Sequence, residues 1–594
     1  MRTRETGNNN HIGSVSGSLS KIWRRFWPML ILLGISVVAV FLGYIGFYKY
    51  FLMKETPVSP LSILYRSLQL ITLESGYVTG IMPWELQLAR FLAPLALIGT
   101  ILSALMINFN NQLHVFLLKF TKKHVIICGM GRNGRQLAYN FRKQNRKVVI
   151  IEEDAKLEDL EFCKELGATI LHGNATDQSI LLKARIDRAE HVIASCGVDE
   201  INIEISMQAF KIINDKDPKH IVNFYVHIVD LKLLNLFKSH KIFTVTIDKF
   251  EAKIFNVYEI SARVLFQNHH LDRIRIAEDS PGIVNLVLFG FGKMGTHIAL
   301  QTARIAHYAN GKKPRITIID KNMDEKKELF LNNYPRFEKV CDVTYYNKNI
   351  ESLDILSELS DWAKDNNQCI TIAICLGNDW LNFSNALKIQ GKLNTFDIPI
   401  LVRMANDSTL PNLFEKDNGI GRQVHAFGKT SEVSTTEILL SEKLNILAKA
   451  IHEDFVKKQL FIGASPNRPG LQPWNILHPD FKDSSLQQAD HIPAKLRSIK
   501  CYTRDKKIEE TDKMVVDEFT TAEIEIMAKM EHIRWVSERL IDGWTQGEYD
   551  AENRVNPHLI GWNKLTDEVK DFDRDAVREI PRLLKKTGLL IYRI

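Results

Sequence analysis

Two long uncharged apolar stretches constrain this chain more than any other feature. Residues 27–48 read WPMLILLGISVVAVFLGYIGFY and residues 91–109 read FLAPLALIGTILSALMINF, with no acidic or basic side chain in either. A helix of about 20 residues crosses a hydrocarbon core of about 30 Å. The polar leader of residues 1–26 favours an anchor over a signal peptide, which stays the alternative. The sequence therefore predicts a membrane hairpin that spans twice.

Basic residues on both sides of this hairpin predict its orientation. By the positive-inside rule, such residues mark the cytoplasmic ends of membrane spans. We therefore expect a multi-pass protein of the cell inner (plasma) membrane, in contact with the lipid bilayer, with cytoplasmic N- and C-termini and everything after residue 110 in the cytosol. The basic residues are Lys21, Arg24 and Arg25 before the first span, and Lys119, Lys122 and Lys123 after the second.

The loop between the spans has the layout of a pore. Residues 60–74 are apolar at helical spacing but too short to cross, which favours a re-entrant half-helix. The order of span, half-helix, polar turn and span resembles the pore module of tetrameric potassium channels. The potassium signature T-V-G-Y-G lines a filter with backbone carbonyls, whereas this chain has TLESGYVTG. A ring of Glu74 carboxylates would favour inorganic cations without fine selectivity; alternatively, the loop only caps a two-helix anchor. The candidate pore residues are Thr72, Glu74, Ser75, Gly76 and Tyr77.

A glycine-rich motif follows the second span directly. The sequence HVIICGMGRNGRQLAYNFRKQNRKVVIIEED has the order strand, Gly129-x-Gly131-x-x-Gly134, amphipathic helix and strand. In a dinucleotide-binding unit the glycines permit a tight turn, a close approach to pyrophosphate, and close packing of helix on strand. Arg132 follows the second glycine, and Glu152 stands where an acidic residue binds ribose hydroxyls. We therefore predict a Rossmann-like unit whose cofactor is NAD(H) or another adenine nucleotide.

The same pattern recurs later in the chain. NLVLFGFGKMGTHIALQTARIA contains Gly290, Gly292 and Gly295, and RITIID ends in Asp320. Downstream segments also recur, since HIVNFYVHIVD parallels IPILVRMANDS. A duplicated domain explains these pairs, and the second crevice is either a further nucleotide site or an empty structural platform.

Residues 124–270 resemble the TrkA-N or RCK domain, which regulates potassium channels and transporters. The resemblance rests on GMGRNG, Glu152, HGNATDQSILLKARI at 172–186, and the pair Asp199 and Asn202; residues 283–425 are similar to a diverged second copy. It implies nucleotide or metal-ion binding at the carboxyl ends of the strands. It also implies an eight-lobed ring, which a homotetramer with two copies per chain would supply. Asn174 stands where many family members have Asp, which leaves the ligand open.

The last 150 or so residues hold another duplication. LAKAIHEDFVKKQ, which starts at 447, aligns with MAKMEHIRWVSER, which starts at 527, and Trp474-x-x-Leu477 aligns with Trp562-x-x-Leu565. This region resembles the paired RyR repeat of ryanodine receptors and bacterial proteins, which implies a helical domain with a cleft for a signalling nucleotide. An aromatic-lined cleft with basic groups can stack a base and pair with phosphate; the alternative for His532 and Trp535 is a place in the core between helices. The candidate cleft residues are His532, Trp535, Arg539, Trp544, Tyr549 and Lys570.

Composition excludes several other functions. A net charge of +7 over 594 residues is mild and does not predict a nucleic-acid partner. The seven cysteines are odd in number and never spaced C-x-x-C, so we predict neither a disulfide framework nor a metal site. A dehydrogenase needs a polar catalytic constellation, and none is apparent near either glycine motif, so we expect a protein that is not an enzyme.

Together these features predict a multidomain protein with a two-span α-helical hairpin, two α/β Rossmann-like (RCK) domains and an all-α RyR repeat pair. Its expected function is that of a ligand-gated, potassium-channel-like protein in which the cytosolic domains sense a nucleotide and gate cation flux, for homeostasis or defence. The alternatives are a non-conducting membrane-anchored sensor or scaffold and, less favoured, an NAD(P)-dependent enzyme. The expected segments are 1–26 (leader), 27–110 (spans and loop), 120–275 and 281–430 (Rossmann-like domains), and 440–594 (RyR pair).

Overall fold

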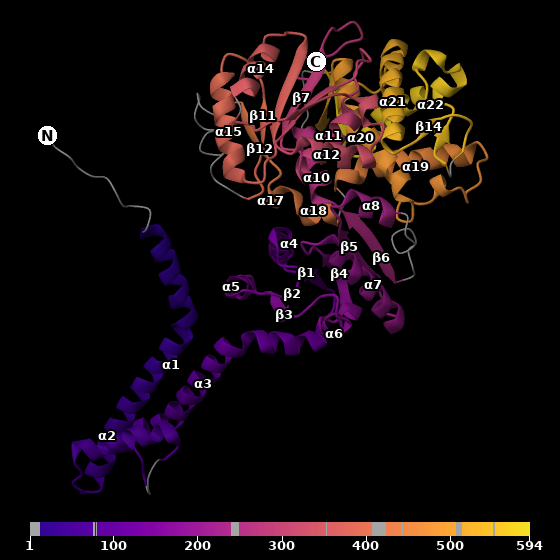
Figure 1. Ribbon diagram of the computed structural model, residues 1–594. Coiled ribbons are helices and arrows are strands. Elements are labelled where there is room, and N and C mark those ends of the chain that lie inside the picture. The colour runs from indigo at the N-terminus through magenta and orange to yellow at the C-terminus, as the bar shows by residue number, and fades with distance from the viewer. Residues whose placement is uncertain are drawn as a thin grey trace, which may run out of the picture. The chain divides into compact units, whose positions relative to one another are not determined.

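The chain forms two compact units, Met1–Lys119 and Phe120–Ile594 (Figure 1). The computed structural model describes residues 12–74, 78, 80–238, 249–351, 353–406, 423–440, 443–506, 514–550 and 553–594.

The first unit is a helical hairpin with a short helix in its connecting loop. Its helices are α1 (Ile12–Met53), α2 (Pro60–Gln69), the 3-10 turn η1 (Leu70–Thr72) and α3 (Trp84–Leu117). The helix expected over residues 60–74 is thus present as α2 and η1. It begins at Ser59, whose hydroxyl accepts from the Ser62 backbone N–H at 3.3 Å, with Pro60 in the first turn. α1 begins at Ile12, so the helix extends into the expected polar leader.

The two long helices of this unit pack closely at a glycine. A Cβ added at Gly46 of α1 would lie 2.5 Å from the Leu86 backbone nitrogen of α3, so only glycine allows this approach. Two stretches, Leu30–Met53 and Trp84–Ser103, are long and apolar enough to cross a membrane, and only 22% and 28% of their best windows are buried. Their apolar side chains therefore face mostly outward, as lipid-facing side chains do.

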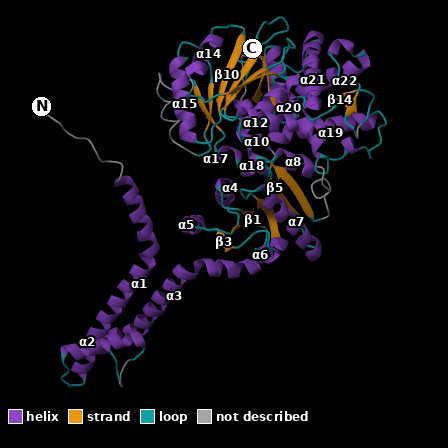
Figure 2. Cartoon of the chain, in the orientation of Figure 1, coloured by secondary structure: helices purple, strands orange, loops and turns teal. Residues whose placement is uncertain are grey.

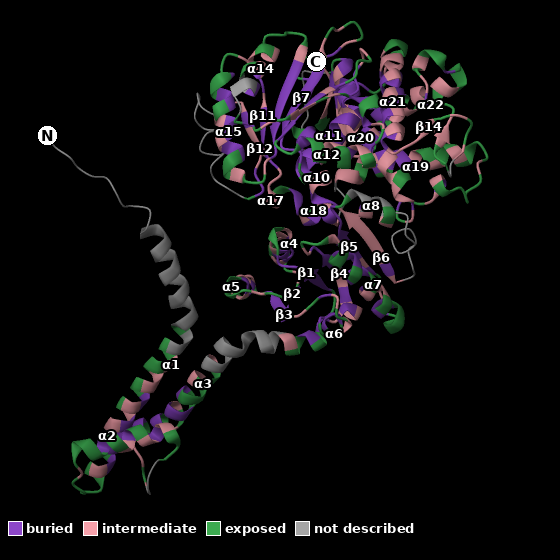
Figure 3. Ribbon diagram, viewed as in Figure 1, coloured by how far each residue is buried: buried purple, intermediate pink, exposed green. Residues whose placement is uncertain are grey.

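The second unit contains two six-stranded parallel sheets with one topology. The first has the order β3-β2-β1-β4-β5-β6 and the second, counted from its other edge, β9-β8-β7-β10-β11-β12. Both are the 3-2-1-4-5-6 order of a dinucleotide-binding fold. Helices flank the strands of each sheet (Figure 2). The central strands β7 and β10 of the second sheet are almost wholly buried (Figure 3), so their apolar runs form its core.

The 3-10 turn η2 (Leu118–Phe120) contains the boundary between the two units in the sequence. The elements of the first sheet region are β1 (His124–Cys128), α4 (Arg132–Lys143), β2 (Val148–Glu152), α5 (Leu157–Leu166), β3 (Thr169–His172), α6 (Gln178–Lys183), η3 (Ile186–Arg188), β4 (Ala189–Ala194), α7 (Asp199–Lys216), β5 (Val222–His227), α8 (Leu231–Lys238), β6 (Phe250–Phe255) and α10 (Val257–Asn268). Those of the second are β7 (Ile283–Phe289), α11 (Lys293–Ile305), β8 (Arg315–Asp320), α12 (Met323–Asn333), α13 (Phe337–Val340), β9 (Asp342–Asn347), α14 (Leu353–Ala363), β10 (Gln368–Ile374), α15 (Asp379–Lys392), β11 (Ile400–Arg403), β12 (Val424–Phe427), α17 (Thr430–Val433) and α18 (Thr436–Leu439).

The C-terminal region is helical, with two short pairs of strands. β13 pairs with β16 in antiparallel fashion, which ties the two repeat halves together at one edge. Its elements are η4 (Lys443–Asn445), α19 (Ile446–Phe461), η5 (Pro469–Leu471), α20 (Pro479–Ser498), β13 (Cys501–Asp505), α21 (Thr521–Ile541), β14 (Thr545–Gln546), β15 (Val555–Asn556), η6 (Trp562–Lys564), α22 (Asp567–Arg578), α23 (Ile580–Lys586) and β16 (Leu589–Arg593).

The helical region shares a hydrophobic core with the second sheet region. Ala494 of α20 and Met530 and Ile541 of α21 belong to the same buried cluster as Ile298 of α11. The helical repeats and the second Rossmann-like fold are therefore packed as one body. The predicted fold class, with two Rossmann-like sheets, two apolar helices and a helical C-terminal region, is confirmed.

Candidate functional site

The first glycine motif forms the turn that its spacing predicts. Gly129 has φ +95, and a Cβ on Gly134 would lie 2.0 Å from the Gly129 carbonyl oxygen, whereas a Cβ on Gly131 would meet nothing within 4 Å. Gly129 is thus needed for the positive φ of the turn and Gly134 for the close approach to the Gly129 carbonyl. Gly131 instead leaves open space at the start of α4. Glu152 Oε2 accepts from the Met130 N–H at 2.6 Å, which draws this carboxylate to the glycine turn.

The second motif repeats this geometry. Gly290 has φ +90, and a Cβ on Gly295 would lie 2.1 Å from the Gly290 carbonyl oxygen. Asp320 accepts from the Phe291 N–H at 2.8 Å and from Lys326 Nζ at 2.6 Å. Burial alone would raise the pKa of Asp320, but these donors hold it below its ordinary value. Asp320 is therefore a carboxylate at neutral pH.

Two matched asparagines fix the strand ends beside each glycine turn. Asn202 accepts from the Cys196 N–H at 2.8 Å and donates to the His227 carbonyl at 2.9 Å. Asn382 accepts from the Leu376 N–H at 2.7 Å and donates to the Arg403 carbonyl at 2.9 Å. The Asp199 and Asn202 pair that carries the family resemblance thus has a positioning role, and Asp199 accepts from the Val229 N–H at 2.7 Å.

A cavity of about 530 Å³ lies at the glycine turn of the second sheet. Its wall combines residues at or just after the carboxyl ends of five strands, β7 to β11, with Tyr258, which comes from α10 of the first sheet region. Basic side chains outnumber carboxylates on this wall, so it suits an anionic ligand. The glycine and Asp320 positions were predicted; the basic residues were not, although Lys293 follows the second glycine as Arg132 does in the first motif. The charged lining residues are Lys293, Lys321, Lys326, Lys348 and Arg403, with Asp320 and Glu351.

The corresponding cavity of the first motif is smaller, at about 180 Å³. Gly131 and Arg132 line it, together with Lys293 and Arg403 from the second sheet region. The predicted ligand residues Glu152 and Asn174 are not part of its wall. Asn174 Oδ1 instead accepts from the Thr176 N–H at 2.9 Å and caps its own loop.

Helix α10 joins all three parts of the second unit. Tyr258 stacks on His297 of α11 with ring centroids 6.3 Å apart, and the Arg403 guanidinium lies 5.3 Å from the Tyr258 ring. Further along α10, the buried Arg263 donates to Asp490 of α20 through Nε at 2.7 Å and Nη2 at 3.1 Å. No local sequence pattern indicates this ion pair, because its partners lie 227 residues apart.

The predicted repeat cleft is only partly assembled. The Arg539 guanidinium lies 5.8 Å from the Trp535 ring and 5.0 Å from the Trp544 ring, so these three residues meet. His532 is buried, and its Nε2–H donates to the Ile560 carbonyl at 2.7 Å, which makes it a core histidine. Lys570 lies over Trp562, at 5.9 Å, and Tyr549 is 66% exposed in the β14–β15 loop.

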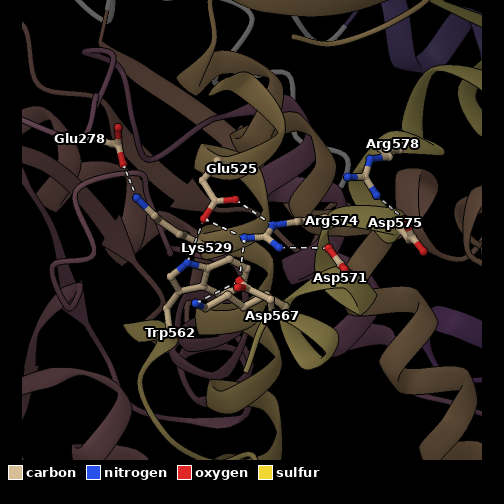
Figure 4. A network of polar contacts seen from close by, with 10 residues as sticks. Glu278, Glu525, Lys529, Trp562, Asp567, Asp571, Arg574, Asp575 and Arg578 are labelled. Carbon is tan, nitrogen blue, oxygen red and sulfur yellow. Dashed lines mark hydrogen bonds and ion pairs between the residues drawn. The ribbon is translucent and has the colours of Figure 1, made fainter. Parts of the chain in front are cut away.

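Trp562 stands at the centre of a polar network in the second repeat (Figure 4). Its Nε1–H donates to Glu525 Oε1 at 3.2 Å, and Arg574 Nε donates to Glu525 Oε2 at 2.9 Å. The Arg574 guanidinium lies 5.8 Å from the Trp562 ring, and its Nη1 donates to Asp571 at 3.0 Å. The hydrogen bond from Arg574 lowers the pKa of Glu525. These contacts hold Glu525 and Arg574 beside Trp562.

The predicted pore residues lie at the end of the short helix in the first unit. The Thr72 hydroxyl donates to the Gln69 carbonyl at 2.9 Å, and Gln69 Nε2 donates to Glu74 Oε2 at 3.2 Å. Glu74 is exposed. Ser75, Gly76 and Tyr77 lie outside the described residues.

Comparison with known proteins identifies two domains in the chain. Residues 125–245 match the TrkA-N domain and residues 509–593 match the RyR domain. Both resemblances found in the sequence are thereby confirmed, and the chain contains a TrkA-N domain and a RyR domain.

The curated relatives match over a limited stretch. Potassium channel protein 1 of Methanocaldococcus jannaschii is 37% identical over 95 residues, which cover 16% of this chain and 28% of that protein. A Trk system potassium uptake protein TrkA homolog of Archaeoglobus fulgidus is 33% identical over 88 residues, covering 15% and 20%. The chain spans about a quarter of the length of the curated relatives it matches. Among solved structures, the GsuK channel bound to NAD has a TM-score of 0.38 at 14% identity, covering 73% of this chain and 86% of that chain.

Proposed function

We propose that this protein regulates the passage of potassium or a similar monovalent cation across a membrane, and that an adenine nucleotide in the second glycine crevice controls it. The proposal is supported by the TrkA-N domain, by relatives named as potassium channel and potassium uptake proteins, and by two helices apolar enough to span a membrane. The observation that carries the nucleotide part is the basic cavity of about 530 Å³ at the second glycine turn.

The chemistry of this cavity suits a phosphorylated ligand. The α11 N-terminus and the open space at Gly292 allow phosphate oxygens to approach backbone N–H groups. Lys293 and Lys348 then supply ammonium groups for charge-assisted hydrogen bonds. Burial raises the pKa of Cys375 on the wall to about 12, so its thiol is protonated near neutral pH. This favours a binding and regulatory role over nucleophilic catalysis.

Transmission from the cavity runs through α10. Tyr258 at the start of this helix touches the cavity, and Arg263 one turn later binds Asp490 of the helical repeats. A ligand can shift the equilibrium between two arrangements of these domains only to the extent that it binds one arrangement more tightly than the other. Because η2 ends at Phe120 and β1 begins at His124, the second span is joined to the first sheet by a short segment. We propose a homotetramer, in which four chains contribute eight Rossmann-like lobes.

Calorimetric titration of the full-length protein in detergent with ADP and with NAD tests the binding step. Loss of one charged hydrogen bond costs about 1.5–3 kcal/mol, so Lys293→Gln is expected to weaken binding by about ten-fold or more. Lys364→Gln is the matched control, since Lys364 follows α14, is 67% exposed, and pairs with Asp361 at 2.8 Å, away from the cavity. Equal affinity in both variants, or no binding to the parent protein, would refute the site.

A further inference from the structure

The two glycine crevices can be compared position by position at the acidic residue that ends the second strand of each sheet. Asp320 of β8 pairs in register with Asn347 of β9, and the Asp320 carbonyl accepts from the Lys348 N–H at 3.1 Å. Glu152 of β2 pairs in the same way with the last residue of β3, and its carbonyl accepts from the Gly173 N–H, also at 3.1 Å. The two strand ends therefore share one backbone geometry, so their residues can be matched by counting along the chain.

The side chains at these matched strand ends differ in charge. In the second sheet, three lysines line the cavity of about 530 Å³ together with Asp320. In the first sheet, two of the matched positions are glutamates and the third is a glycine. The same backbone thus carries a basic edge in the second crevice and an acidic edge in the first. The matched residues are Lys321 and Glu153, Lys326 and Glu158, and Lys348 and Gly173.

Both carboxylates on the wall of the second crevice are already compensated by lysines. Lys326 Nζ lies 2.6 Å from Asp320 Oδ2, and Lys388 Nζ lies 3.3 Å from Glu351 Oε1. Lys321 is exposed, and no hydrogen bond or ion pair of its ammonium is found within the residues that the structure describes. An anion beside Asp320 therefore meets a positive charge that the protein itself does not neutralise.

The position of this charge indicates which part of a nucleotide it contacts. In a dinucleotide-binding fold, the acidic residue at this strand end binds the hydroxyls of the adenosine ribose, and a nearby basic residue accommodates a 2′-phosphate. Lys321 directly follows that acidic residue, and Lys348 follows the neighbouring strand. A phosphate monoester carries a charge of about −1.5 to −2 near neutral pH, which these two ammonium groups can balance.

We propose that the second glycine crevice binds a dinucleotide with a 2′-phosphate on its adenosine ribose, as in NADP, more tightly than NAD. Lys321 provides the main contact, because Lys348 also pairs with Glu358 at 3.5 Å. The first glycine crevice disfavours the same phosphate, because Glu153 and Glu158 stand at the matched positions. This inference rests on the nucleotide site proposed above and adds the ligand class that the site prefers.

Calorimetric titration of the full-length protein in detergent with NADP and with NAD, at one ionic strength, tests this preference. The two ligands differ only in the 2′-phosphate, so the ratio of their dissociation constants reports the contacts of that group. One hydrogen bond to a charged group changes affinity by about ten-fold or more, so NADP is expected to bind at least about ten-fold more tightly than NAD.

Two lysine variants separate the ribose end of the ligand from its pyrophosphate. Lys321→Gln is expected to bring the two dissociation constants close to each other, because it removes the ammonium beside the 2′-phosphate from an exposed position. Lys293→Gln is the contrasting variant, since Lys293 stands at the glycine turn; it should weaken both dinucleotides by a similar factor and keep their ratio. Lys364→Gln, outside the cavity, should leave both constants as in the parent protein.

The outcomes of this experiment distinguish the preference from the site itself. NAD binding as tightly as NADP, or a ratio that Lys321→Gln leaves unchanged, overturns the preference and leaves the crevice as a site for NAD or ADP. Absence of binding by both dinucleotides refutes the nucleotide site, and the preference with it.

Discussion

Removing the Arg263 side chain is expected to weaken the contact between the TrkA-N domain and the helical repeats. Burial alone would lower the pKa of Arg263, but Asp490 holds it above its ordinary value, so the pair is charged. Both side chains are more than nine-tenths buried, at 8% and 6% exposure. Deleting one partner of a buried pair costs about 3–5 kcal/mol, because the other charge is left without compensation. In the Arg263→Met variant, Gln301 Nε2 still donates to Asp490 Oδ2 at 3.1 Å. The expected cost in stability therefore lies near the lower end of that range.

Thermal unfolding of the full-length protein in detergent, followed by tryptophan fluorescence, measures this effect. At about 2–4 °C per kcal/mol, Arg263→Met is expected to lower the midpoint by about 6–12 °C. Adding Asp490→Leu is expected to restore most of the loss, because it removes the uncompensated charge. Arg582→Met is the control, since that arginine is 56% exposed and surface pairs contribute about 0–1 kcal/mol. The reasoning is refuted if Arg263→Met lowers the midpoint no more than Arg582→Met does, or if the Arg263→Met, Asp490→Leu double variant has a lower midpoint than Arg263→Met alone.

Three further predictions follow from the geometry. Gly295→Ala is expected to lower the melting midpoint, since its Cβ would lie 2.1 Å from a backbone oxygen, whereas Gly292→Ala, with open space, is expected to weaken nucleotide binding without loss of stability. Burial is the main cause that lowers the pKa of His307 from 6.5 to about 4. Between these two pH values His307 is therefore protonated in the unfolded chain and neutral in the folded chain. Stability is then full above pH 6.5 and falls towards pH 4 by on the order of 3 kcal/mol, a slope that His307→Gln should reduce in pH-dependent melting. Glu74→Gln is expected to lower the preference for cations over anions in reversal-potential measurements, because it removes the carboxylate at the end of the short helix; an unchanged preference favours a tether over a pore.

The features predicted from the sequence are those encoded locally. The glycine turns are fixed by residues only a few positions apart, and each sheet follows from its alternating strands and helices. The equivalence of His452 and His532 is likewise visible from two short aligned helices. Such patterns need no knowledge of the tertiary structure, which is why the fold class and both domain resemblances were predicted.

The binding surfaces depend on contacts that no local pattern encodes. Lys321 follows β8, Lys348 follows β9 and Arg403 ends β11, so these three residues meet only once the second sheet is formed. Glu152 has the predicted position, but its carboxylate binds the Met130 N–H and lies off the cavity wall.

Cation flux from liposomes that contain the full-length protein tests whether a nucleotide in the second glycine crevice controls permeation. We expect a potassium flux that changes saturably with ADP or NAD. In Lys293→Gln, the nucleotide concentration that gives half of the effect on the flux should rise by the same factor as the dissociation constant of the nucleotide. Lys364→Gln should behave as the parent protein. A flux that ignores nucleotide, or a half-effect concentration that Lys293→Gln leaves unchanged while binding weakens, would contradict control through the second glycine crevice.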